Sequence, residues 1–331
     1  MILNVLGLVL LVALALFSAW LGRRAAGAKM PLLRRFGPIV FALGTLGFLA
    51  VIAIALFGFY RLNTTASHPV TAVKVAGTPD QIARGQKLAS LCVTCHSSAG
   101  ALPLDGSTKN VISKPPIGTL YSPNLTPGGP IKALSDGEVL RALREGIDKN
   151  GRPLLGMTSW SFRYLSDDDA QAIIAYLRSQ PAVAHDVPAR DLNLLAGLAV
   201  GAGLAPTSVQ PAIATPIVAP KAAVSAEYGR YLVAFSGCRD CHGKNLNGGT
   251  ALLGIEALSP VPLGPSLLVK TKLYDQAGFV NTIRTGTRPN GLRLPNDRMP
   301  WKDFNSAFSD DELKAMFQYL NTVDAAAAAT P

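Results

Sequence analysis

The chain contains one five-residue pattern twice, at Cys92 to His96 and again at Cys238 to His242. In a C-x-x-C-H pattern, two thiols three positions apart can form thioether bonds to the vinyl groups of one haem, and the histidine places an imidazole nitrogen on the iron. The two patterns contain all four cysteines, so none remains for a disulfide or a catalytic thiol. The sequence therefore predicts two covalently bound haem c groups, attached through Cys92, Cys95, Cys238 and Cys241, with His96 and His242 as iron ligands.

Two other kinds of site use paired cysteines. A structural zinc site would combine two C-x-x-C halves, but such halves usually lie within about twenty residues of each other, and these lie far apart in the chain. A thioredoxin-like pair follows a strand in a βαβ unit, whereas residues 83–91 and 226–235 are predicted to be short helices. The spacing therefore favours haem attachment.

Each haem iron has a sixth position, for which Met157 and Met299 are the candidates. Met157 follows His96 by 61 residues and Met299 follows His242 by 57, each on a loop before the last helix of its domain. This agreement indicates an internal repeat. His/Met ligation is the pattern that raises the haem potential for electron transfer.

The remaining methionines and histidines are expected to have other roles. Met1 and Met30 belong to a predicted membrane hairpin, and Met316 lies in the middle of a helix, where we expect a core residue. His68 and His185 are competing ligands, but each lies in a linker, where we expect a solvated histidine.

Two apolar stretches precede the first motif, at residues 2–21 and 37–60, and each is uncharged and long enough to span a bilayer. The positive-inside rule puts the basic turn between them in the cytoplasm and both ends of the hairpin outside. A cleaved signal peptide is the alternative for the first stretch, but it has no basic residues before its apolar run. We predict two helices in a bacterial cytoplasmic membrane, with the haem domains on the periplasmic side.

The net charge of +10 is concentrated in the hairpin. Residues 1–61 hold six of the 31 basic residues and none of the 21 acidic ones, so the rest of the chain is nearly balanced. Most of the charge imbalance thus serves membrane topology, and nothing indicates a nucleic-acid partner.

The predicted fold class is all-α, with a transmembrane helical hairpin followed by two haem domains. Ser135 with Glu138 forms the sequence signature of a capping box, and Ser166 and Ser309 are expected to cap the last helix of each domain. The predicted boundaries are 1–61 for the hairpin, 62–79 for a linker, 80–182 for the first domain, 183–224 for an Ala/Pro-rich connector, 225–322 for the second domain and 323–331 for an Ala-rich tail.

At these residues the chain resembles the class I cytochromes c, and more narrowly the cytochrome c subunits of membrane-bound alcohol and gluconate dehydrogenases. The resemblance covers residues 80–182 and 225–322 and rests on residues 118–127, 141–146, 165–177, 284–286 and 299–301. It implies a compact helical fold for each haem, His and Met axial ligands, and a proline-glycine element that buttresses the proximal histidine. Pro116 to Gly118 and Pro262 to Gly264 match this element by position.

We expect a dihaem electron carrier without a catalytic residue, working as a subunit of a respiratory or photosynthetic membrane complex. Its expected partners are integral membrane subunits, which the Gly and Ala positions of the hairpin would contact, redox donor and acceptor proteins, and membrane lipid. One alternative is a dihaem enzyme, either a peroxidase or a thiosulfate-oxidising cytochrome, which needs an open iron site. Another is a structural subunit.

Overall fold

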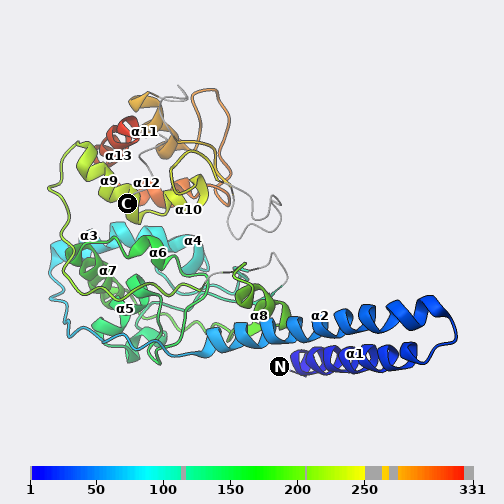
Figure 1. Ribbon diagram of the computed structural model, residues 1–331. Helices are drawn as coiled ribbons and strands as arrows, with labels where there is room; N and C mark the ends of the chain where they lie inside the picture. Colours follow the sequence, from blue (N-terminus) through cyan, green and yellow to red (C-terminus); the bar gives the residue numbers. More distant parts are fainter. Residues whose placement is uncertain (1, 113–116, 206, 250–262, 268–274, 324–331) are drawn as a thin grey trace. The chain divides into compact units, whose positions relative to one another are not determined.

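The computed structural model describes residues 2–112, 117–205, 207–249, 263–267 and 275–323. These residues are mostly helical, which confirms the all-α class (Figure 1). The chain divides into two compact units: residues 1–64, 112–120 and 190–207 form the first, and the remainder forms the second.

The first unit is built on a helical hairpin of α1 (Ile2–Ala26) and α2 (Pro31–Asn63), which run side by side (Figure 1). Both helices are long and apolar enough to cross a membrane. Their apolar side chains are largely exposed, as Leu10 (59%) and Phe57 (51%) illustrate. The core helix of a soluble protein would bury them, so the hairpin fits a membrane anchor.

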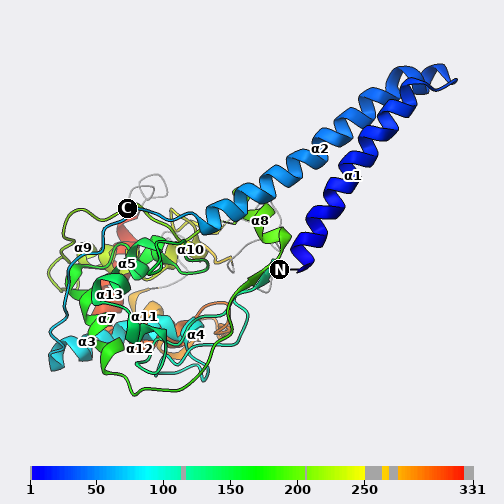
Figure 2. The same cartoon turned by 90° about the horizontal axis from the view of Figure 1, so that it is seen from below.

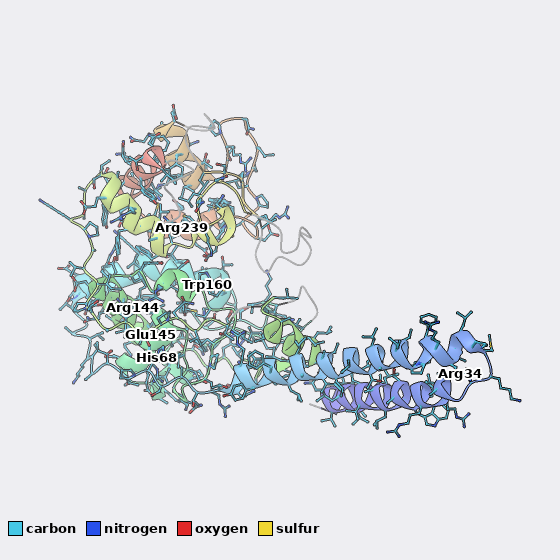
Figure 3. All side chains as sticks on the ribbon, viewed as in Figure 1. Arg34, His68, Arg144, Glu145, Trp160 and Arg239 are labelled. Carbon is cyan, nitrogen blue, oxygen red and sulfur yellow. The ribbon has the colours of Figure 1, made fainter. Side chains whose placement is uncertain are left out.

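Basic side chains gather at the turn of this hairpin. Arg23 and Arg24 lie in the last turn of α1, where the helix dipole favours positive charge. Arg24 also covers the Trp20 ring at 4.4 Å from its centroid. Figure 3 shows Arg34 at the same end, just after the start of α2 at Pro31. The positive-inside rule assigns such a basic turn to the cytoplasmic side of a membrane.

Several small residues of the hairpin lie in the contact between α1 and α2, and their contact with other subunits stays a prediction. A Cβ added at Gly22 would lie 3.3 Å from the Phe41 side chain, and one at Gly44 would lie 3.0 Å from the Ser18 hydroxyl. The Ser18 hydroxyl also donates to the Phe41 carbonyl at 2.8 Å. Close packing of α1 on α2 therefore uses sites that small residues offer.

A third apolar helix, α8 (Leu194–Gly201), packs against the end of α2 (Figure 2). A Cβ at Gly58 of α2 would collide with the Gly197 carbonyl, and one at Gly201 would collide with the Ile54 carbonyl. The Arg61 guanidinium donates to the Val200 carbonyl at 3.1 Å near the end of α8. The expected connector thus contains a helix that belongs to the membrane-anchor unit.

Two short strands complete the first unit. β1 (Gly118–Thr119) pairs antiparallel with β2 (Asp191–Leu192), with Gly118 opposite Leu192. Gly118 has a φ of +120° and lies against the β2 backbone, so a side chain there would collide with it.

The second unit contains two halves whose α-helices follow a corresponding order, and among the described residues the first half also has two 3-10 helices, η1 and η2. In the first half these are α3 (Pro79–Ala89), η1 (Ser90–Cys92), α4 (Val93–His96), η2 (Pro130–Ala133), α5 (Asp136–Glu145), α6 (Ser159–Phe162) and α7 (Asp167–Ser179). In the second half they are α9 (Ala226–Phe235), α10 (Cys238–His242), α11 (Gln276–Thr285), α12 (Trp301–Ala307) and α13 (Asp310–Thr322).

The first and last helices cross in each half at a glycine. A Cβ at Gly85 on α3 would collide with the Ala172 carbonyl on α7, and a Cβ at Gly229 on α9 would collide with the Ala315 carbonyl on α13. Met316, on the adjacent position of α13, is 2% exposed and confirms its prediction as a core residue. Both crossings therefore allow backbone contact that any larger residue would prevent.

The predicted helix caps are present. Ser135 accepts from the Glu138 amide while the Glu138 carboxylate accepts from the Ser135 amide, and Ser309 with Glu312 forms the same capping box. Ser166 caps α7 by accepting from the Asp169 amide at 3.1 Å. These caps fix where α5, α7 and α13 begin, and thereby where the loops before them end.

Candidate haem-binding sites

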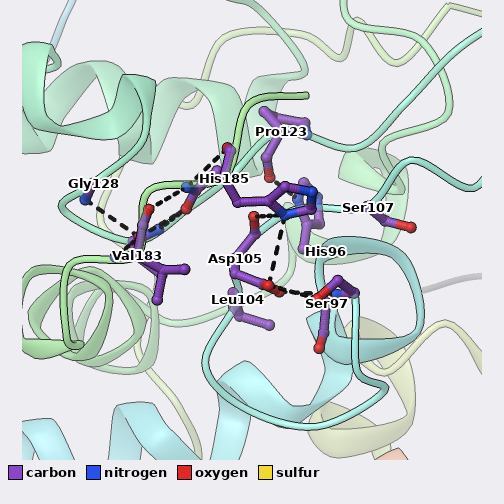
Figure 4. A network of polar contacts seen from close by, with 12 residues as sticks. His96, Ser97, Leu104, Asp105, Ser107, Pro123, Gly128, Val183 and His185 are labelled. Atoms are coloured by element: carbon purple, nitrogen blue, oxygen red, sulfur yellow. Dashed lines mark hydrogen bonds and ion pairs between the residues drawn. The ribbon is translucent and has the colours of Figure 1, made fainter. Parts of the chain in front are cut away.

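The first C-x-x-C-H segment follows directly from α3 and forms η1 and α4. His96 is buried at 8% exposure, and its Nδ1 lies 2.9 Å from the carbonyl oxygen of Pro123 (Figure 4). A carbonyl oxygen can only accept, so the ring donates from Nδ1 and keeps the lone pair on Nε2. Burial lowers the pKa of His96, which favours this neutral form.

The second segment repeats this geometry. His242 is 7% exposed, and its Nδ1 donates to the carbonyl oxygen of Pro265 at 2.6 Å. Gly264, just before that proline, lies so close to the imidazole that an added Cβ would be 2.5 Å from Nδ1. Burial lowers the pKa of His242 as well.

The two histidines therefore have the properties of metal ligands. In the described part of the chain, Nε2 of neither ring has a hydrogen-bond partner in the protein. A neutral imidazole held at Nδ1 by a carbonyl, with Nε2 free, is the usual arrangement of a histidine that binds a metal. These residues fit a haem iron.

The proline carbonyls correct the assignment that the resemblance implied. Gly118 belongs to strand β1, and it is Pro123 that supports His96. In the second half Gly264 does lie against His242, but the supporting carbonyl belongs to the next residue, Pro265. Pro116 and Pro262 lie outside the described residues. A Pro-x-Leu sequence at both sites, beginning at Pro123 and Pro265, is the signal that would have identified these carbonyls.

The cysteines of both motifs are free of disulfides. Burial raises the pKa of Cys92 to about 12 and that of Cys241 to about 11, so these thiols are protonated at neutral pH. Among the described residues, no group of three or more His, Cys, Asp or Glu side chains is placed to hold a metal ion. The zinc alternative thus finds no ligand set in this part of the structure.

The loops that carry Met157 and Met299 begin in the same way. Each starts at a helix-ending glycine with positive φ, Gly146 (+69°) or Gly286 (+68°), and closes a small hairpin in which the amide eight positions later donates back to that glycine's carbonyl. Both methionines are half-buried and packed against the hydrophobic core. The structure thus gives them equivalent positions along the chain.

His68 and His185 are partly buried and hydrogen-bonded, whereas we expected solvated histidines. The His68 side chain is 18% exposed, and its Nδ1 lies 2.7 Å from Glu145 Oε2; Figure 3 shows these residues together with Arg144. The His185 side chain is 27% exposed, and its Nδ1 donates to the Asp105 carbonyl at 2.9 Å (Figure 4). The sequence could not reveal this because each partner lies more than 70 residues away.

The segments predicted as linker and connector also bond to the first half. The Ala66 amide donates to the Gly151 carbonyl at 2.8 Å, and the Gln210 amide donates to the Glu145 carbonyl at 2.9 Å. Backbone hydrogen bonds of this kind hold both segments along the surface of the domain.

Comparison with known proteins identifies the domain. Residues 82–181 match the family model for cytochrome c. Residues 82–181 therefore form a cytochrome c domain, and this family implies covalently bound haem c and electron transfer.

Relatives extend the similarity beyond this domain. The gluconate 2-dehydrogenase cytochrome c subunit of Pantoea cypripedii is 34% identical over 255 residues, which cover 72% of this chain and 51% of the relative. The cytochrome c subunit of the quinone alcohol dehydrogenase of Gluconobacter oxydans is 28% identical over 297 residues, covering 82% and 59%. A nicotinate dehydrogenase subunit of Pseudomonas putida is 36% identical over 131 residues, covering 38% and 11%. The chain thus spans at most 59% of the length of these relatives.

Proposed function

We propose that this chain is a membrane-anchored dihaem c-type cytochrome, acting as the electron-transfer subunit of a membrane-bound dehydrogenase complex. The repeated histidine site carries the proposal: in both halves a buried C-x-x-C-H histidine donates from Nδ1 to a proline carbonyl, and its Nε2 has no hydrogen-bond partner among the described residues. The relatives named as cytochrome c subunits of gluconate and alcohol dehydrogenases support the kind of complex.

The residues take equivalent roles in the two halves. Haem c, when bound, supplies an iron that gains and loses one electron. In each half the two cysteines would attach the porphyrin, and the histidine together with Met157 or Met299 would bind the iron. The surrounding core excludes water, and ligand identity and burial set the potential. In this proposal the chain carries electrons, and a partner subunit oxidises the substrate.

The hairpin sets the location in this proposal. Its basic turn faces the cytoplasm, α1 and α2 span the cytoplasmic membrane, and the haem domains work on the periplasmic side. The exposed apolar faces of α1 and α2 contact lipid and integral membrane subunits. A dehydrogenase subunit is the electron donor, and a membrane electron carrier is the acceptor.

The haem content tests the proposal directly. The intact mass of the mature chain should exceed that of the polypeptide by two haem groups. The double variant C238A/C241A should lose one haem and C92A/C95A the other, each seen by mass and by a stain for covalent haem. A mass equal to that of the bare polypeptide would overturn the proposal, and a persistent high-spin haem in the oxidised protein would favour the dihaem enzyme.

Purification in mild detergent tests the assignment to a complex. The native chain should copurify with a dehydrogenase subunit, and its haem should become reduced when the substrate of that subunit is added. Isolation of a free monomer from native membranes would contradict this part of the proposal.

A further inference from the structure

Two hydrogen-bonded bridges connect the haem-attachment segments to the opposite half of the second unit. In the first bridge the Thr94 amide donates to Asp303 Oδ2 at 3.2 Å, and the Thr94 hydroxyl donates to the same oxygen. In the second bridge the Ser161 hydroxyl donates to Asp240 Oδ1 at 2.9 Å. Asp303 and Ser161 are buried, Asp240 is half-buried and Thr94 is exposed.

These bridges are one contact made twice. Thr94 and Asp240 are both the middle residue of their motif, directly before the second cysteine. Ser161 and Asp303 both lie four residues after a candidate methionine ligand, on α6 and α12. Equivalent residues that contact each other reciprocally are the signature of a two-fold related interface. In the first bridge the motif residue, Thr94, is the donor, whereas in the second bridge the motif residue, Asp240, is the acceptor. Each bridge therefore pairs one hydroxyl donor with one carboxylate acceptor.

Arg84 links the two halves beside the bridges. Its Nε and Nη2 donate to Asp169 at 2.8 and 3.1 Å, and its Nη1 donates to Glu312 at 2.6 Å. Asp169 and Glu312 are the third residues of α7 and α13, so Arg84 also joins equivalent positions. The Tyr231 hydroxyl donates to Asp169 at 2.6 Å. Breaking such a buried, charged network is costly, so it holds the halves in one arrangement.

We propose that the Thr94–Asp303 and Asp240–Ser161 bridges position the two haem sites for electron exchange within one chain; this rests on the proposed dihaem function. Each bridge joins the cysteine side of one site to the methionine side of the other. The exchange moves one electron from the reduced haem site, which becomes oxidised, to the oxidised haem site, which becomes reduced, and no proton or group is transferred. The four bridge residues act as positioning residues.

The test uses the full-length chain in detergent with the double variant T94V/S161A, which removes one hydroxyl donor from each bridge. After flash photoreduction, the rate of electron redistribution between the sites should fall about tenfold or more, because small misplacements of reacting groups cost that much. Haem content and both midpoint potentials should stay at their wild-type values. A merely structural interface would leave the redistribution rate unchanged.

Two controls make the result specific. The single variant T94S keeps the hydroxyl and should retain the wild-type rate. The control T322V/S306A also removes two hydroxyls, each of which, among the described residues, bonds to the backbone of its own helix, and it should leave the rate unchanged. If the double variant loses haem, S161A alone provides the same measurement with a smaller expected slowing.

An unchanged redistribution rate in T94V/S161A, or in S161A if only that variant keeps both haems, would overturn the inference. Failure of the underlying function looks different, because the wild-type chain itself would then contain fewer than two haems. No redistribution phase would appear in any variant.

Discussion

One backbone carbonyl fixes which ring nitrogen of each motif histidine is protonated. Because the carbonyls of Pro123 and Pro265 can only accept, they fix the protonated nitrogen of His96 and His242 at Nδ1. Nε2 then keeps the lone pair that a metal requires. At the second site the space for this arrangement depends on a residue with no side chain, Gly264.

The substitution Gly264→Ala should damage the second site selectively. The added Cβ would lie 2.5 Å from the His242 ring, so the ring must move away from the Pro265 carbonyl. We expect a loss of stability of about 1–3 kcal/mol and a changed absorption spectrum or lower haem content for one of the two haems. The matched control is Ser122→Ala, at the residue that precedes Pro123 in the first half, and it should leave both haems unchanged. Identical spectra for G264A and the wild type would contradict this reading.

At the scale of elements, the caps and helix crossings are repeated more faithfully than the loops. The last helices α7 and α13 both begin at a serine cap, Ser166 and Ser309, and α5 and α11 begin at Ser135 and Asp275. Both pairs of first and last helices cross at a glycine. The Met-bearing loops differ in length by two residues yet begin with the same small hairpin. The positions of the helix ends thus fix where the loops with Met157 and Met299 begin and end.

The substitution Ser135→Ala tests the cap of α5 and its pH dependence. Hydrogen bonds from the Ser135 amide and hydroxyl lower the pKa of Glu138, so the cap stabilises the fold above the unfolded-state pKa of about 4.3 and this stabilisation is lost as the pH falls through the lower folded-state pKa. Losing the cap should cost about 1 kcal/mol at neutral pH, and the difference should narrow in acid. Denaturant unfolding at several pH values measures this.

Ser306, an exposed residue of α12, offers the control for that experiment. Ser306→Ala removes a hydroxyl whose one partner in the described part of the chain is the Lys302 carbonyl, one turn earlier. We expect little loss of stability and no pH dependence. A pH-independent cost for S135A would show that the Glu138 carboxylate contributes nothing to the cap.

At the scale of the whole molecule, the unit that contains the hairpin includes other elements besides α1 and α2. α8 and the short β1–β2 pair come from segments far along the chain, yet they belong to the same compact unit as the hairpin. The glycines of α2 and α8 make that contact close. The hairpin therefore has an internal partner, and its outward apolar faces remain for lipid and other subunits.

Lys29→Cys, in the turn between α1 and α2, tests the proposed topology. All native cysteines would be held in thioethers, so this one thiol reports alone. A membrane-impermeant maleimide should label it in inverted vesicles and leave it unlabelled in intact spheroplasts. A second variant, Lys74→Cys, should show the reverse pattern. Labelling of Lys29→Cys from the periplasmic side would contradict the positive-inside assignment.

The sequence alone predicted the two C-x-x-C-H motifs, the two long apolar helices and the capped helices, because each depends on residues that are close together in the chain. Only the tertiary structure decided which carbonyl holds each histidine, that His68 and His185 are paired, that α8 belongs with the hairpin, and that Thr94 and Asp240 reach across to Asp303 and Ser161. These features depend on contacts between residues far apart in sequence, whose positions are fixed only when the helices pack.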